Sequence, residues 1–73
     1  MDVQQLADEL RRMYNGAPQG EQTTMIHLFG IKYAHELTRT SPGSVVEQSG
    51  LRSSYVTEVH KGRRLAKYVK LKE

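Results

Sequence analysis

Short hydroxyl side chains, followed by cationic ones, occupy the C-terminal part of the chain, and they are the residues best suited to chemistry. Ser53, Ser54 and Thr57 come first, and basic residues become frequent from Lys61 onward. Hydroxyl groups exchange hydrogen bonds with base edges and phosphates, whereas Lys and Arg neutralise phosphates. These residue types support binding to a polyanion without any bond being made or broken.

No other set of side chains matches a catalytic or metal-binding pattern. The three histidines lack a ligand spacing such as HExxH, and a chain without cysteine has no thiolate ligands. His35 and Glu36 are adjacent, but no nucleophile or oxyanion site accompanies them, so they fit a polar helix end better than an acid–base pair. We expect neither enzymatic activity nor a metal or cofactor site.

Apolar residues around Gly50 are spaced as in two short helices joined by a tight turn. Val45 and Val46 precede the glycine, and Val56 and Val59 lie six and nine positions after it. Glycine adopts positive φ without steric cost, so the chain can reverse there while each helix buries one stripe. The spacing predicts a helix-turn-helix.

Two longer helices are predicted upstream of this unit. Residues 2–15 carry apolar residues at spacings of three and four, with Asp2 as the N-cap. Residues 21–37 are apolar on more than one side, which predicts a central, buried helix. Gly30 in its interior costs roughly 1 kcal/mol relative to alanine, so we expect it to permit the close approach of another helix.

Serine, proline and glycine set the remaining helix boundaries. Ser41 before Pro42 is a helix-start signal and predicts a short third helix that ends at the turn glycine. The fourth helix is predicted over about residues 53–61, with Gly62 as a left-handed C-cap.

The segment after Gly62 is open to two interpretations. It forms either a short fifth helix or an extended tail, and in both cases Leu65 and Val69 would pack on the core. The fold class is therefore all-α, a four- to five-helix bundle that contains a helix-turn-helix and forms a single domain over residues 1–73.

Charge is distributed unevenly along the chain. Residues 1–36 hold three basic and five acidic residues, whereas residues 37–73 hold eight basic and three acidic ones. The basic half coincides with the predicted helix-turn-helix, as expected of a surface that meets phosphates. In a small protein, such a basic segment is also compatible with a merely solvated surface.

Length and composition narrow the classes of protein to which this chain can belong. The chain has 73 residues, no cysteine and a hydrophobic fraction of 37%, so a modest packed core must stabilise it, and a deep active site is not expected. No apolar run approaches the roughly 20 residues that span a bilayer, and the amphipathic, acidic N-terminus is unlike a signal peptide. We expect a cytoplasmic protein without a membrane partner.

Seven residues, about a third of the chain with their surroundings, carry a resemblance to a known class: Val45, Gly50, Leu51, Val56, Val59, Lys61 and Gly62. At these positions the chain resembles the helix-turn-helix of phage-repressor or Xre-like DNA-binding proteins, and the rest looks like small bacterial helix-turn-helix-like domains. Two positions depart from the pattern. Val46 stands where a small residue is usual and Ser49 where an apolar one is, so the interhelical angle is expected to differ.

The resemblance implies that the front of the fourth helix faces base edges in the DNA major groove. The base-edge candidates are Arg52, Ser53, Ser54, Tyr55, Thr57 and Glu58. The phosphate candidates, assigned from their charge and position, are Lys61, Arg63, Arg64 and Lys67. A carboxylate at Glu58 repels phosphate unless it accepts from a cytosine amino group or pairs with an arginine.

Double-stranded DNA is therefore the predicted partner, either for transcription regulation or as the targeting part of a larger system. One small module buries little surface, so useful specificity would require a homodimer or a fused or separate partner protein. The alternative function is a protein–protein interaction module that presents the same helix-turn-helix surface to an acidic protein.

Overall fold

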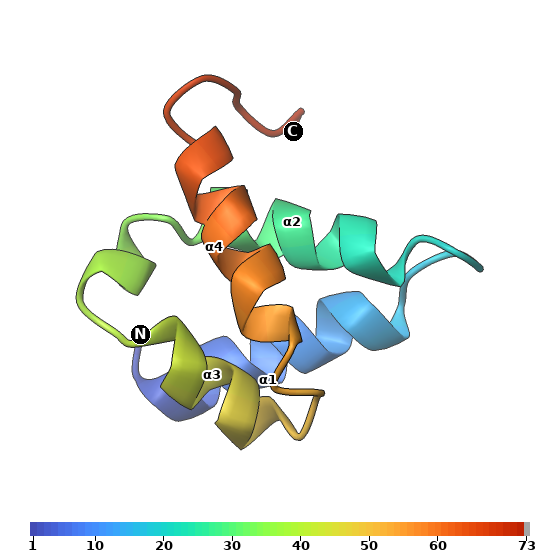
Figure 1. Cartoon of the computed structure of the whole chain (residues 1–73), viewed down its shortest axis with the longest axis vertical. Helices are drawn as coiled ribbons and strands as arrows, with labels where there is room; N and C mark the ends of the chain where they lie inside the picture. The colour runs from blue at the N-terminus through green and yellow to red at the C-terminus, as the bar shows by residue number, and fades with distance from the viewer. Residues whose placement is uncertain (73) are drawn as a thin grey trace.

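Four α-helices and one 3₁₀ turn make up the computed structural model, which describes residues 1–72 (Figure 1). The elements are α1 (Val3–Asn15), α2 (Gln22–Lys32), η1 (Glu36–Thr38), α3 (Pro42–Ser49) and α4 (Tyr55–Leu65). No strand occurs within these 72 residues, so the all-α prediction is confirmed. α4 crosses α2 and α3 packs beside α1, as Figure 1 shows.

α1 begins where the sequence predicts, because its first turn carries a reciprocal cap. The Asp2 carboxylate accepts from the Gln5 backbone N–H at 2.8 Å, and the Gln5 side chain accepts from the Asp2 backbone N–H at 2.9 Å. Two N–H groups that lack helical partners are thereby satisfied. The apolar stripe of α1 then buries Leu6, Ala7 and Leu10.

α2 is shorter than the sequence predicts. The helix ends at Lys32 instead of continuing to Leu37, and the chain turns into η1. Phe29 and Tyr33 pack with ring centroids 5.1 Å apart, and the turn after them brings Leu37 into the core at 1% exposure. The apolar residues on several sides of segment 21–37 therefore belong to two elements that share one core.

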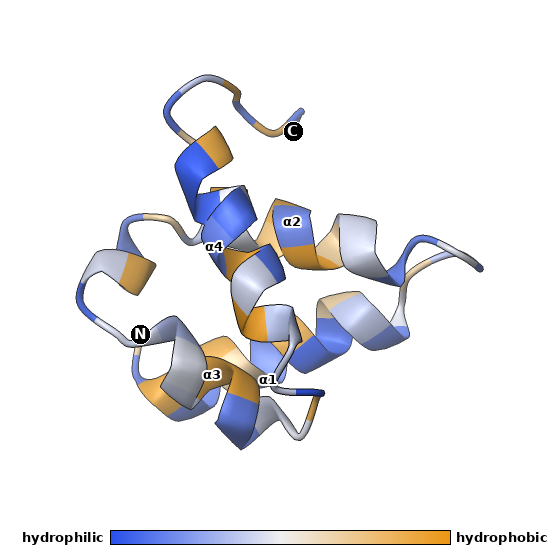
Figure 2. Cartoon of the chain, viewed as in Figure 1, coloured by the Kyte–Doolittle hydropathy of each residue, from blue (hydrophilic) through white to orange (hydrophobic). Residues whose placement is uncertain are grey.

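One core joins all four helices and η1. Its fully buried large side chains are Leu6, Leu10, Ile26, Phe29, Leu37, Val45, Val46 and Val59. Hydrophobic and hydrophilic segments alternate along the helices in Figure 2, as expected of helices that bury one side. Val59 is buried as predicted from the Gly50 spacing, whereas Val56 is only half-buried at the edge of the core.

α2 and α4 touch through their backbones at a pair of glycines. A Cβ on Gly30 would lie 2.6 Å from the Val59 carbonyl oxygen, and one on Gly62 would lie closer still to that of His27. Gly30 therefore permits a close helix approach, as predicted. The assignment of Gly62 as a C-cap is wrong, because α4 runs through it to Leu65 and the residue is needed for this contact.

The C-terminal segment is not a fifth helix, and it lacks the core packing that both interpretations of the sequence gave to Leu65 and Val69. After α4 the chain makes a turn over residues 66–68 and forms no fifth helix within the described residues. Leu65 and Val69 are 42% and 45% exposed, so neither packs on the core.

Candidate nucleic-acid interface

α3, the turn at Gly50 and α4 form the predicted helix-turn-helix. Ser41 caps α3 by accepting from the Ser44 backbone N–H at 3.4 Å, and Pro42 occupies the first helical position. Gly50 has φ of 79°, the left-handed conformation that ends α3 without a Cβ penalty. The predicted start and end of α3 are confirmed, and α4 begins at Tyr55, about two residues later than expected.

Ser49 closes the turn through its side chain. It is 3% exposed, and its hydroxyl donates to the Val46 carbonyl at 2.6 Å and accepts from the Leu51 N–H at 3.2 Å. Both functions of the hydroxyl are satisfied, so a polar residue is stable where related turns carry an apolar one.

Arg11 ties α1 to the end of α3. Its guanidinium donates to the Ser49 carbonyl at 2.9 Å and to the Gln48 carbonyl at 3.2 Å. These carbonyls belong to the last turn of α3 and lack helical partners, so a cation there also suits the helix dipole. Sequence reasoning missed Arg11, because no local pattern shows a contact between residues 38 positions apart.

One exposed stripe runs along α4. We call it the recognition stripe, and it consists of Ser54, Thr57, Lys61 and Arg64, spaced by three, four and three residues. All four side chains are exposed, as are Arg52 and Ser53 in the preceding turn. The structure thus brings hydroxyl and cationic groups together on one helical face.

Tyr55 lies off this stripe. Its hydroxyl is 3.3 Å from that of Tyr14, and the two rings pack at a centroid distance of 5.6 Å and an angle of 57°. The hydrogen bond between Tyr14 and Tyr55, ahead of burial, raises the pKa of Tyr14 above its ordinary value. Tyr55 therefore anchors the start of α4 to α1, although its sequence position suggested a base contact.

Glu58 is held by two cationic or hydrogen-bonding neighbours. Its carboxylate accepts from His27 Nε2 at 2.6 Å and from Lys61 Nζ at 3.4 Å. A carboxylate only accepts, so the His27 proton sits on Nε2. The hydrogen bond from His27, ahead of the bond and charge of Lys61, lowers the pKa of Glu58. The partner is thus a histidine of α2, which the sequence did not indicate.

A family model described as an HTH-like domain matches residues 2–72. This chain belongs to that family. The match covers nearly the whole chain and assigns no phage-repressor or Xre-like subgroup. A search of curated proteins found no match, and a search of solved structures also found none.

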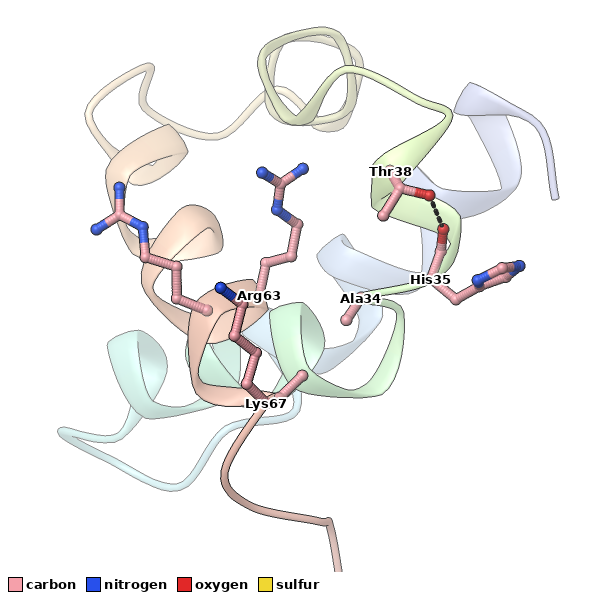
Figure 3. Close-up of a pocket in the computed structure, with 7 residues that line it drawn as sticks. Ala34, His35, Thr38, Arg63 and Lys67 are labelled. Carbon is pink, nitrogen blue, oxygen red and sulfur yellow. Dashed lines mark hydrogen bonds between the residues drawn. The ribbon is translucent and has the colours of Figure 1, made fainter.

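The basic residues of this HTH-like domain fall into two groups. Lys61 and Arg64 lie on the recognition stripe, whereas Arg63 points toward η1 and donates from Nη1 to the Leu37 carbonyl at 3.0 Å. Lys67 follows in the turn after α4 and lines a groove together with Arg63 and Arg64 (Figure 3). Three of the four phosphate candidates therefore line one groove, which Arg64 joins to the stripe, and Lys61 lies outside it.

Within residues 1–72 of this HTH-like domain, no three His, Asp or Glu side chains lie close enough together to hold a metal ion. None of the helices described in the structure combines the length and the apolar character needed to cross a membrane.

Proposed function

We propose that this HTH-like domain binds double-stranded DNA by placing the recognition stripe of α4 in the major groove. The observation that carries the proposal is the stripe itself, which follows directly on the turn of a helix-turn-helix. An α-helix fits the major groove, and side chains at the front of the helix reach base edges there.

The electrostatics of α4 suit this role. Glu58 is the only acidic residue in the helix, and its carboxylate is hydrogen-bonded by His27 and Lys61. The outward cations Lys61 and Arg64 then face solvent beside the hydroxyl groups, where they can contact phosphates on either side of the bases.

Residues around the turn divide into contacting and supporting groups. We assign Arg52, Ser53, Ser54 and Thr57 to base edges, because all four are exposed. Tyr55 and Glu58, whose polar groups meet Tyr14 and His27, support the position of α4 instead.

A salt-dependent titration with random-sequence duplex DNA tests the proposal. The affinity should fall steeply with salt, with a log–log slope near −0.9 for each phosphate neutralised. Replacing Lys61 and Arg64 together by alanine should weaken binding to all duplexes and flatten the slope by about two such contacts. The matched control is Arg12→Ala, an exposed arginine on α1 that pairs with Glu9.

Sequence preference is tested separately from affinity. Thr57→Ala should change the preference among duplex sequences and leave the salt slope unchanged, because a base edge carries no charge to neutralise. Absence of binding to every duplex at low salt, or equal losses in Arg12→Ala and the stripe variants, would refute the proposal.

A protein partner is the second candidate, and one observation favours it. Leu65, Tyr68 and Val69 are 42%, 82% and 45% exposed at the end of α4, next to the basic stripe. Apolar side chains beside cations are typical of a surface that receives an acidic protein. If the domain binds no duplex, this is the surface to examine. If it binds DNA, the same surface would serve a homodimer or a partner domain that adds specificity.

A further inference from the structure

A groove at the C-terminal end of α4 is rich in cations and lies beside the recognition stripe. It runs between this end of α4 and the segment that links α2 to η1, and its lining residues are Ala34, His35, Thr38, Arg63, Arg64, Ala66 and Lys67 (Figure 3). Three of these side chains are permanently cationic, and among the described residues no carboxylate lines the groove.

The positive charge of the groove is not compensated within the described chain. Arg63 and Arg64 lie in the last turn of α4, and Lys67 follows in the turn after it, so three like charges lie close together along the chain. Glu36 is the acidic residue nearest in sequence to the lining residues of η1, and its carboxylate accepts from the Met1 ammonium at 2.7 Å. The α4 dipole places a partial negative charge at this end, which favours the cations there but supplies no carboxylate to pair with them.

Arg63 is held in place for a ligand. Its Nη1 donates to the Leu37 carbonyl at 3.0 Å, which fixes the guanidinium against η1 and leaves further N–H donors. In Figure 3 the Lys67 side chain extends along the groove toward Arg63, while the His35 ring points away. Thr38 donates its hydroxyl proton to the His35 carbonyl at 2.7 Å, so the donors offered to an anion are those of Arg63, Arg64 and Lys67.

We propose that this groove binds a phosphoryl group, as a site that adjoins the recognition stripe and shares Arg64 with it. A fixed guanidinium forms paired N–H bonds to phosphate oxygens, and an ammonium adds a mobile point charge. The phosphoryl group comes either from the DNA backbone, in which case the inference rests on the proposed function, or from a free phosphorylated compound.

NMR titration of the ¹⁵N-labelled chain with inorganic phosphate and with pyrophosphate tests the site, and sodium chloride at equal ionic strength is the reference. Backbone amides of Thr38 and residues 63–67 should shift and saturate with phosphate but not with chloride. Lys67→Ala should weaken phosphate binding about five- to tenfold. The matched control, Lys70→Ala, removes the same charge from a residue that does not line the groove. It should change the affinity for phosphate less than about twofold.

Duplex DNA distinguishes the two sources of the phosphoryl group. If phosphate competes with duplex at constant ionic strength and Lys67→Ala weakens both, the DNA backbone occupies the groove. If Lys67→Ala weakens phosphate binding alone, the ligand is a free phosphorylated compound. Shifts equal to those of chloride, or equal losses in Lys67→Ala and Lys70→Ala, overturn the site. Arg64 belongs to both the stripe and the groove, so the stripe is tested apart from the groove by Lys61→Ala, in which Arg63, Arg64 and Lys67 are all intact. Loss of duplex binding in Lys61→Ala with phosphate binding unchanged would bear on the stripe alone.

Discussion

Glu58 is a carboxylate on a basic helix, and its side-chain contacts keep it from opposing the DNA contact proposed for α4. Its two oxygens bond to His27 and Lys61, from α2 and from α4 itself. This arrangement keeps the negative charge on the side of α4 that meets α2, and the exposed stripe remains positive. His27 is therefore a positioning residue for the proposed DNA contact.

Removing His27 should weaken duplex binding. In His27→Ala, Glu58 loses its strongest partner, and its charge acts on nearby phosphates. We expect the affinity to fall roughly threefold to tenfold, about 0.7 to 1.4 kcal/mol, in a fluorescence anisotropy titration at low salt. Glu58→Gln should bind the duplex as well as the parent or better. The double variant with both His27→Ala and Glu58→Gln should regain the affinity that His27→Ala loses. Equal weakening in the single and double variants would show that His27 acts through the fold instead.

Gly62 is the residue least tolerant of an added methyl group. A Cβ there would meet the His27 carbonyl and the Gly30 backbone, so α2 and α4 would have to separate. Gly62→Ala should destabilise the domain by about 1 to 3 kcal/mol in urea unfolding, although alanine has the higher helix propensity. Gly43→Ala in α3 is the control, since its Cβ would find only the Ser41 hydroxyl at 3.4 Å. Similar stability in both variants would argue against the close crossing.

At the scale of elements, the sequence predicted those boundaries that local chemistry determines. Asp2 caps α1, Ser41 and Pro42 start α3, and Gly50 ends it with a positive φ. Each signal acts within four residues and needs no tertiary partner. Periodicity also separated the buried Val59 from the exposed recognition stripe, so the candidate base-edge hydroxyls were predicted correctly as surface residues.

Boundaries and contacts that depend on tertiary packing were not predictable. α2 stops at Lys32 so that Leu37 reaches the core, and α4 continues through Gly62 because that glycine faces α2. The same limit applies to the candidate site, where the bond from His27 to Glu58 joins residues 31 positions apart. A single sequence gives no periodicity or cap that pairs residues at such separations.

The joint between α1 and α3 depends on Arg11. Arg11→Ala should destabilise the domain by about 1 kcal/mol, because two carbonyls at the end of α3 lose a charged donor at a partly buried site. Hydrogen exchange should also accelerate at the turn amides of Gly50 and Leu51. The control is Arg12→Ala, which removes an exposed surface pair with Glu9 and should destabilise the domain clearly less than Arg11→Ala. If the two variants unfold alike, the Arg11 contacts do not hold the turn.

For the molecule as a whole, acid stability reports on three carboxylates held by cationic or hydrogen-bonding partners. Arg12 lowers the pKa of Glu9, the N-terminal ammonium lowers that of Glu36, and His27 lowers that of Glu58, each below an ordinary value of 4.5. A carboxylate with a depressed folded pKa stabilises the fold above its unfolded pKa, and this contribution is lost as the pH falls through the folded value. Loss of any of the three pairs on acidification therefore lowers the stability of the fold.

Stability to urea should change little between pH 7 and about pH 5 on account of these groups and then decline below about pH 4.5. The net charge of the protein also rises on acidification and affects stability by itself. The sharper measurement is therefore the difference in the free energy of unfolding between the parent and Glu58→Gln at each pH. The parent should be more stable at neutral pH, and the gap should close once Glu58 is protonated in the folded state. Glu47→Gln, an exposed carboxylate on α3, is the matched control and should differ little from the parent at any pH. A gap for Glu58→Gln that persists unchanged at pH 2 would mean that its ionised carboxylate contributes nothing through His27.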